Sequence, residues 1–182
     1  MKRSRRPWVW SIPILALAVL AVLALRSNGG FGPLDAGRTA PSYAARTLEG
    51  DTLDLESLRG RAVLLNVWAT WCKPCVREMP ALQRVHELLE PEGLSIVAVS
   101  VDNAALGLGD PGRDVAAFVE EYGITFTVLL DPESRVESAF QVMGLPMTFL
   151  IDRDGRVRQK ILGARDWDQA EWLRTIRALL EN

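Results

Sequence analysis

Cysteine and histidine are scarce in this chain, which has two cysteines and one histidine in 182 residues. Two cysteines are too few for the disulfide framework that stabilises many small exported domains. Two thiols and one imidazole also fall short of the four ligands of a structural zinc site, and His86 lies eleven residues beyond the second cysteine. We therefore expect no metal ion, and infer that the cysteine pair serves another purpose.

Basic clusters are absent from most of the chain. Residues 1–30 hold five of the 21 lysines and arginines and none of the 23 acidic residues. The remainder carries 16 basic and 23 acidic side chains, a net charge of −7. Such an acidic domain lacks the basic surface with which proteins bind nucleic acid, so we expect no nucleic-acid partner.

Charge is also missing from residues 8–25, an apolar run that follows four basic residues and precedes one. Eighteen helical residues rise about 27 Å, close to the thickness of a bilayer's hydrocarbon core. The charge bias predicts a cytoplasmic N-terminus and a domain on the extracytoplasmic side of the cell membrane. A cleaved secretory signal is the alternative, but no small-x-small cleavage triplet follows the run. We predict that residues 1–26 form a cytoplasmic basic tip and a single-pass signal anchor.

The remaining chain has the length and hydrophobic content of one domain. Residues 27–40 are rich in glycine and predict a flexible linker, so the domain is expected to span residues 41–182. The patterns predict strands at 43–48, 52–55, 62–68, 94–101, 125–130, 147–152 and 157–162, and helices at 75–90, 114–122 (capped by Asp114), 133–140 and 167–180. Strands that alternate with helices indicate an α/β fold, and hairpins at both ends of the domain indicate a mixed sheet.

The segment Trp71-Cys72-Lys73-Pro74-Cys75 follows the buried strand 62–68 directly and precedes a helix. The first sulfur is thereby placed at a helix N-terminus, where free N–H groups and the helix dipole stabilise a thiolate. A second cysteine two residues further along can close a disulfide with it. A pair of buried, inert cysteines is the alternative interpretation.

Three segments together resemble the membrane-anchored TlpA/ResA group of thioredoxin-like proteins: residues 66–75, Glu78-Met79-Pro80 and residues 144–152. The resemblance implies a three-layer sandwich with a central mixed sheet, an N-terminal β-hairpin and a βα insertion. It also implies an exported thiol-disulfide oxidoreductase without a cofactor beyond its own disulfide. Expected substrates are protein disulfides, for example apocytochrome c cysteines, with electrons supplied by a membrane donor of the CcdA/DsbD type.

The resemblance assigns roles to the cysteine segment. Cys72 is the expected nucleophile and Cys75 resolves the mixed disulfide. Trp71 and Pro74 are expected to contact substrates.

Pro146, at the start of a later strand, would be a cis-proline beside the reactive sulfur. Leu145 before it would offer its backbone to an extended substrate peptide. Sequence alone favours a plain strand-initiating proline, so the cis assignment rests on the resemblance. Met147 departs from the threonine expected after it.

Glu78 lies one helical turn after Cys75 and corresponds to a glutamate that tunes the thiols or relays a proton in the family. A solvated surface charge is the alternative. Asn66 stands where cytoplasmic thioredoxins carry a buried aspartate, and it cannot accept a proton. Its presence shifts that task toward Glu78 or water.

Three other functions remain open. A peroxiredoxin-type peroxidase needs the motif P-x-x-x-T-x-x-C, but Thr70 is only two residues before Cys72 and residues 61–69 contain no proline. A copper-binding assembly factor would require a C-x-x-x-C spacing and a distant histidine, and this chain offers neither cleanly. A tethered interaction module without turnover would survive the loss of Cys72.

Overall fold

The central strand β3, Ala62–Trp68, is buried along its whole length, as expected for a segment that is apolar on both faces. It pairs in parallel with β4, Leu94–Ser100, and antiparallel with β6, Met147–Ile151. Leu64, Leu65 and Val67 are fully buried and belong to the hydrophobic core. The strand therefore anchors the loop that follows it and carries the cysteines.

The computed structural model describes residues 36–103 and 110–181, and they belong to one compact unit, Leu34–Asn182. The predicted anchor and most of the predicted linker lie outside the described residues. So does the centre of residues 102–113, a segment that its composition predicts to be a glycine-rich loop. Within the two described ranges, no helix combines the length and the hydropathy needed to cross a membrane.

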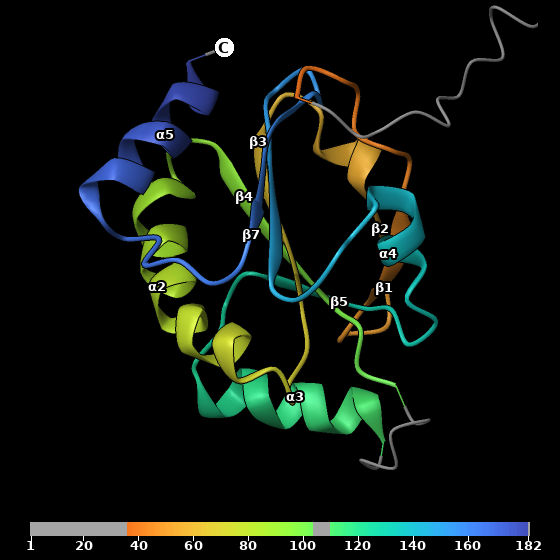
Figure 1. Cartoon of the computed structure of the whole chain (residues 1–182). Helices are drawn as coiled ribbons and strands as arrows, with labels where there is room; N and C mark the ends of the chain where they lie inside the picture. The colour runs from red at the N-terminus through yellow and green to blue at the C-terminus, as the bar shows by residue number, and fades with distance from the viewer. Residues whose placement is uncertain (1–35, 104–109, 182) are drawn as a thin grey trace, which may run out of the picture. The chain divides into compact units, whose positions relative to one another are not determined.

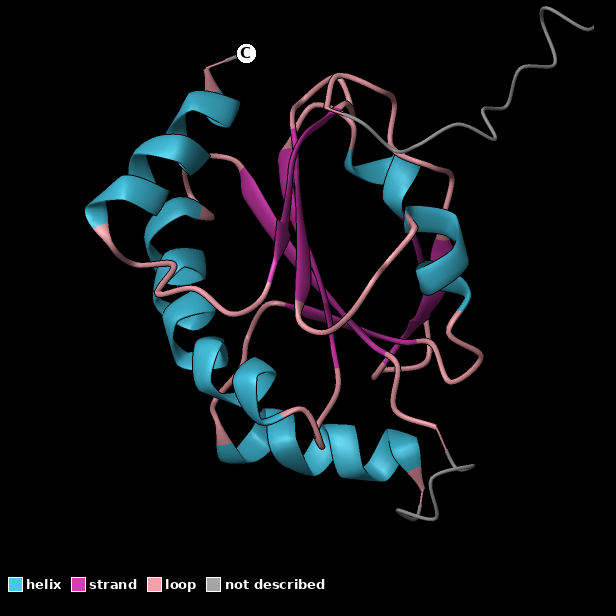
Figure 2. Cartoon of the chain, in the orientation of Figure 1, coloured by secondary structure: helices cyan, strands magenta, loops and turns pink. Residues whose placement is uncertain are grey.

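Seven strands of the described chain form one mixed sheet in the order β2-β1-β5-β4-β3-β6-β7. Figure 2 shows the strands in magenta and the helices that flank them in cyan. The strands not yet named are β1, Ala44–Thr47; β2, Thr52–Asp54; β5, Thr127–Leu130; and β7, Val157–Leu162. β1 and β2 form the expected hairpin, and β1 also pairs antiparallel with β5. The mixed sheet and the N-terminal hairpin predicted from sequence are confirmed.

Helices cover both faces of the sheet. Figure 1 shows α2 and α5 together on one face and α4 on the other. The helices are α2, Lys73–Leu89; α3, Pro111–Glu121; α4, Arg135–Phe140; α5, Ala170–Leu180; and a short 3-10 helix η2, Leu55–Leu58. Phe140 of α4 packs against Phe149 of β6 with ring centroids 5.0 Å apart. Phe118 of α3 packs against Trp68 at the end of β3.

The N-terminus of α3 corrects one prediction. Asp110, not Asp114, caps this helix, and its side chain accepts a hydrogen bond from the Gly112 N–H at 3.0 Å. Asp114 lies inside the first turn. An aspartate followed by proline is a strong helix start, because proline needs no N–H in the first turn and its φ is already helical.

The hydrogen-bonded domain also begins earlier than Pro41. The Gly37 N–H donates to the Val157 carbonyl and the Ala40 N–H to the Gly155 carbonyl, and Thr39 forms a β-bridge with Arg156. Composition alone assigned these residues to the linker, whereas the free edge at the start of β7 provides backbone partners for them.

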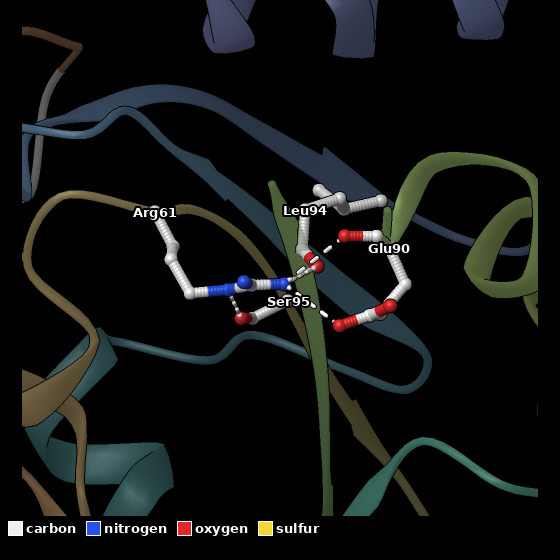
Figure 3. Close-up of polar contacts among 4 residues, drawn as sticks. All are labelled: Arg61, Glu90, Leu94 and Ser95. Carbon is white, nitrogen blue, oxygen red and sulfur yellow. Dashed lines mark hydrogen bonds and ion pairs between the residues drawn. The ribbon is translucent and has the colours of Figure 1, made fainter. Parts of the chain in front are cut away.

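The side chain of Arg61 joins the start of β3 to the end of α2 and the start of β4 (Figure 3). Its Nη2 donates to the Leu94 carbonyl at 2.7 Å and lies 3.2 Å from Glu90 Oε1, while Nε donates to Ser95 Oγ at 2.7 Å. A longer bond of 3.3 Å reaches the Glu90 carbonyl at the helix end. A cation there satisfies free carbonyls and complements the helix dipole.

Replacing Arg61 with alanine is expected to lower the free energy of unfolding by about 1–3 kcal/mol, because carbonyl and hydroxyl partners lose a charged donor. Urea denaturation of the oxidised protein measures this. Arg84→Ala is the control, since Arg84 makes one ion pair with Asp168 and is 57% exposed, which predicts a loss of about 0–1 kcal/mol. Equal losses in the two variants would contradict the role assigned to Arg61.

Candidate active site

The two cysteines lie at the first turn of α2 and form a disulfide, with 5.3 Å between their Cα atoms. The helix begins at Lys73, two residues before the predicted start. Cys72 is its N-cap, and the Cys75 N–H donates to Cys72 Sγ at 3.4 Å. Pro74 fits the first turn because its missing N–H has no partner there. Cys72 is 7% exposed and Cys75 is fully buried, so Cys72 is the cysteine that solvent reaches.

The loop before the cysteines is held at its base by Asp102, a residue that the sequence interpretation missed. The Thr70 N–H donates to Asp102 Oδ2 at 3.0 Å and its hydroxyl donates to Oδ1. The Ser100 hydroxyl adds a third bond to the same carboxylate, at 2.7 Å. An aspartate just beyond a buried strand was the available signal, but it was assigned to the glycine-rich loop.

Pro146 lies beside this loop because β6 is paired with β3. Met147 is opposite Val67 in that ladder, so Pro146 lies at the end of β3 from which the cysteine loop leaves. The Leu145–Pro146 peptide bond is cis, as the resemblance implied. The Pro146 carbonyl accepts a bond from the Gly163 N–H at 2.8 Å. In the described part of the chain, no hydrogen bond to the backbone of Leu145 is found.

Glu78 is buried and is not a solvated surface charge, since only 2% of it is exposed. Its Oε1 accepts a bond from Asn66 Nδ2 at 2.9 Å. Its Oε2 accepts two bonds, from the Arg165 N–H at 3.0 Å and from Trp167 Nε1 at 2.9 Å. Asn66 Nδ2 also donates to Thr148 Oγ1. The carboxylate therefore joins α2 to β3 and to the loop between β7 and α5.

Burial raises the pKa of Glu78 above its ordinary value. The hydrogen bonds from Arg165, Trp167 and Asn66, and the charge of Arg165, act in the opposite direction but do not outweigh burial. The result is a carboxyl group, one helical turn from Cys75, that binds a proton more tightly than a glutamate in water.

Trp167 and Arg165 were not recognised from the sequence. Residues 167–180 were predicted to be helical, but α5 begins only at Ala170, and Trp167 lies in the preceding loop with its side chain fully buried. The amphipathic pattern extended the helix too far, because Trp167 is buried by a loop rather than by a helix face. A tryptophan whose indole N–H needs a buried acceptor was the overlooked signal.

Three large apolar side chains are exposed on segments of the site: Trp71 precedes Cys72 in the chain, Leu162 pairs with Met147 across the β6–β7 ladder, and Met143 precedes Pro146 by three residues. Trp71 is 47% exposed, Met143 75% and Leu162 49%. A Cβ at position 144 would contact Leu162 Cδ1 at 3.5 Å, so the segments of Met143 and Leu162 lie side by side. Met143 was also missed, because a methionine in a loop gives no periodic signal.

Within the described residues, no group of three or more histidine, cysteine, aspartate or glutamate side chains is arranged to hold a metal ion. The site that the structure assembles consists of a disulfide, a buried carboxyl group and a partly exposed apolar surface. That combination suits thiol-disulfide exchange.

Comparison with known proteins agrees with this chemistry. The AhpC/TSA family model matches residues 36–160. Thiol-disulfide oxidoreductase ResA of Geobacillus thermodenitrificans is 37% identical over 167 residues, which cover 90% of this chain and 91% of the relative. The ResA protein of Bacillus subtilis is 31% identical over 166 residues, covering 90% and 88%. The chain belongs to the AhpC/TSA family and to the ResA group.

Solved structures support the same assignment of fold. Two thiol:disulfide interchange proteins of Chlorobium tepidum superpose with TM-scores of 0.71 and 0.66, at 33% and 27% identity. They cover 81% and 80% of this chain and 99% and 98% of their own. The fold is therefore the thioredoxin-like α/β fold with a seven-stranded mixed sheet, and the ResA-group chain is a thiol-disulfide oxidoreductase with a Cys72–Cys75 couple.

The geometry also separates this ResA-group site from the peroxidase alternative. Ala69, three residues before Cys72, carries no hydroxyl group. The hydroxyl of Thr70 is bound to Asp102. A threonine hydroxyl that faces the reactive sulfur, as the peroxidase motif requires, is therefore not formed by this loop.

Proposed function

We propose that the chain is an exported, membrane-tethered oxidoreductase that reduces disulfides of other proteins, such as the haem-binding cysteines of apocytochrome c. The observation that carries this proposal is the position of the Cys72–Cys75 disulfide at the first turn of α2, with the accessible Cys72 beside Pro146. Residues 1–26 would anchor the protein, with the domain on the extracytoplasmic side. Re-reduction in that oxidising compartment would require a membrane electron donor of the CcdA/DsbD type.

The exchange proceeds in two steps. The thiolate of reduced Cys72 attacks a substrate disulfide, so that a mixed disulfide forms and one substrate sulfur leaves as a thiolate and takes up a proton. Cys75 then loses its proton and attacks the Cys72 sulfur, which releases the second substrate thiol. Two electrons pass to the substrate, and the protein keeps the disulfide. The greater exposure of Cys72 supports this order.

Glu78 is proposed to accept the proton that Cys75 must lose. It lies one turn after Cys75 on α2 and is buried with it. Burial raises the pKa of the Glu78 carboxyl group and so brings it closer to the pKa of a thiol. A smaller difference in pKa makes proton transfer between the two groups easier. Asn66 cannot take this role, and its amide instead donates to Glu78.

Substrate docking is assigned to the surface around Cys72. The backbone of Leu145, which has no hydrogen bond within residues 36–103 and 110–181, would bond to an extended peptide, with Pro146 holding that segment beside the sulfur. Trp71 and Pro74 would contribute apolar contact on the cysteine side. The exposure of Trp71 supports this assignment.

Charge near the sulfurs supports the reducing direction. Among the described residues, Asp102 is buried beside the cysteine loop and Glu78 is buried on the helix that carries Cys75. Negative groups partly offset the stabilisation that the helix N-terminus gives to a thiolate, and a less stabilised thiolate makes the dithiol a better reductant. A strongly oxidising disulfide donor requires the opposite, a stabilised reduced form.

The reduction potential of the Cys72–Cys75 couple tests the proposed direction. The full-length chain is equilibrated against dithiothreitol and glutathione buffers. We expect a reduction potential below about −200 mV, in the range of thioredoxins and glutaredoxins. A value near about −120 mV, as for strong oxidants, would overturn the proposal.

A further inference from the structure

The loop between β7 and α5 donates two hydrogen bonds to the Glu78 carboxylate. Trp167 is fully buried in this loop, and its Nε1 donates to Glu78 Oε2 at 2.9 Å. The Arg165 N–H donates to the same oxygen at 3.0 Å. Two donors on one oxygen fix the direction in which the carboxylate points, because rotation of the side chain would break both bonds.

The charged and titratable surroundings of Glu78 are simple. From β3, Asn66 presents a neutral amide, and Thr148 of β6 reaches the cluster only through that amide. From the loop, Arg165 supplies the one charge that acts on Glu78 among the described residues. From α2 itself, the Cys75 thiol lies one turn away once the disulfide is reduced.

The same loop is attached to the docking segment. The Gly163 N–H donates to the Pro146 carbonyl at 2.8 Å. The Arg165 guanidinium donates to the carbonyls of Leu162, Gly163 and Ala164 at 2.8–3.3 Å and so holds this stretch together. The donors of Glu78 and the support of Pro146 thus belong to one short, internally bonded segment.

We propose that Trp167 is a positioning residue for thiol-disulfide exchange, whose indole N–H holds the Glu78 carboxylate in place for proton transfer from Cys75. The inference rests on the proposed role of Glu78. It assigns to Trp167 a function beyond packing, although its ring also packs against Trp172 with centroids 5.0 Å apart.

Trp172 provides the matched control. It belongs to the same aromatic pair, but it is only partly buried, and the hydrogen bonds of Glu78 go to Asn66, Arg165 and Trp167. A role in packing alone predicts that Trp167→Phe and Trp172→Phe alter the enzyme in the same way. The proposed role predicts that only Trp167→Phe changes the ionisation of Glu78.

The test is the pH dependence of disulfide reduction by the reduced full-length chain. Disulfide-bonded insulin is the probe substrate. Loss of a donor to the charged carboxylate should move the Glu78 inflection upward by about one pH unit in Trp167→Phe. Trp172→Phe should leave it in place, and Glu78→Gln should remove it.

The outcomes separate the two hypotheses. If Trp167→Phe and Trp172→Phe share the wild-type inflection while Glu78→Gln lacks it, the inference about Trp167 is overturned and the role of Glu78 stands. If Glu78→Gln keeps the inflection, both are overturned. Should Trp167→Phe not fold, NMR of the wild-type protein decides: the Trp167 indole N–H resonance should titrate with the Glu78 inflection, and an unchanged resonance would refute the proposal.

Discussion

Replacing Cys75 with serine is expected to trap the protein in a mixed disulfide with its substrate, while turnover falls to background, a loss of more than about 1000-fold. The buried Cys75 is the group that releases the substrate from Cys72, and serine cannot form the disulfide that this requires. Incubation with an oxidised peptide, followed by mass spectrometry under non-reducing conditions, detects the adduct.

Cys72→Ser is the matched variant. It should lose turnover equally but form no adduct, because the remaining thiol of Cys75 is fully buried at the first turn of α2. Adduct formation by Cys72→Ser, and not by Cys75→Ser, would reverse the proposed order of attack. An unchanged cellular phenotype in Cys72→Ser would favour an interaction module without redox chemistry.

Replacing Glu78 with glutamine is expected to slow disulfide reduction at neutral pH by about 100-fold or more, the usual contribution of a positioned proton acceptor. The same change should alter the pH dependence of stability. Because the folded-state pKa of Glu78 is raised by burial, the protonated form is favoured by folding. The protonated carboxyl group therefore contributes to the free energy of unfolding. This contribution is fully present below the unfolded-state pKa of Glu78 and is lost as pH rises through its folded-state pKa.

Glu78→Gln lacks this loss, so the stability of the wild type relative to the variant should decrease between pH 4 and pH 8. Urea unfolding of the oxidised proteins across this range measures the difference. Glu87→Gln is the control, since Glu87 lies on the exposed face of the same helix and accepts a bond from Gln83. A wild-type curve parallel to that of Glu78→Gln would show that the carboxyl group is not destabilised by burial.

Elements defined by local patterns were predicted well. β3 coincides with the predicted strand 62–68, and the hairpin of β1 and β2 lies within its predicted limits. The predicted start of α3 was wrong because two aspartates near it can each cap a helix. Only Asp110 precedes a proline, and it is the residue that caps α3. The predicted start of α5 was wrong because Trp167 fits the apolar spacing of the helix, although it lies in the loop before α5.

The sequence alone determined that Cys72 and Cys75 share one helix start after a buried strand, because that arrangement depends on neighbours along the chain. It also supplied Glu78 as a candidate by its spacing from Cys75. Only the tertiary structure decided what surrounds that carboxyl group. Asn66, Arg165 and Trp167 lie 12, 87 and 89 residues from Glu78, and no periodicity reports such contacts. They arise from strand order and loop path, which set the burial and the donors that control its proton.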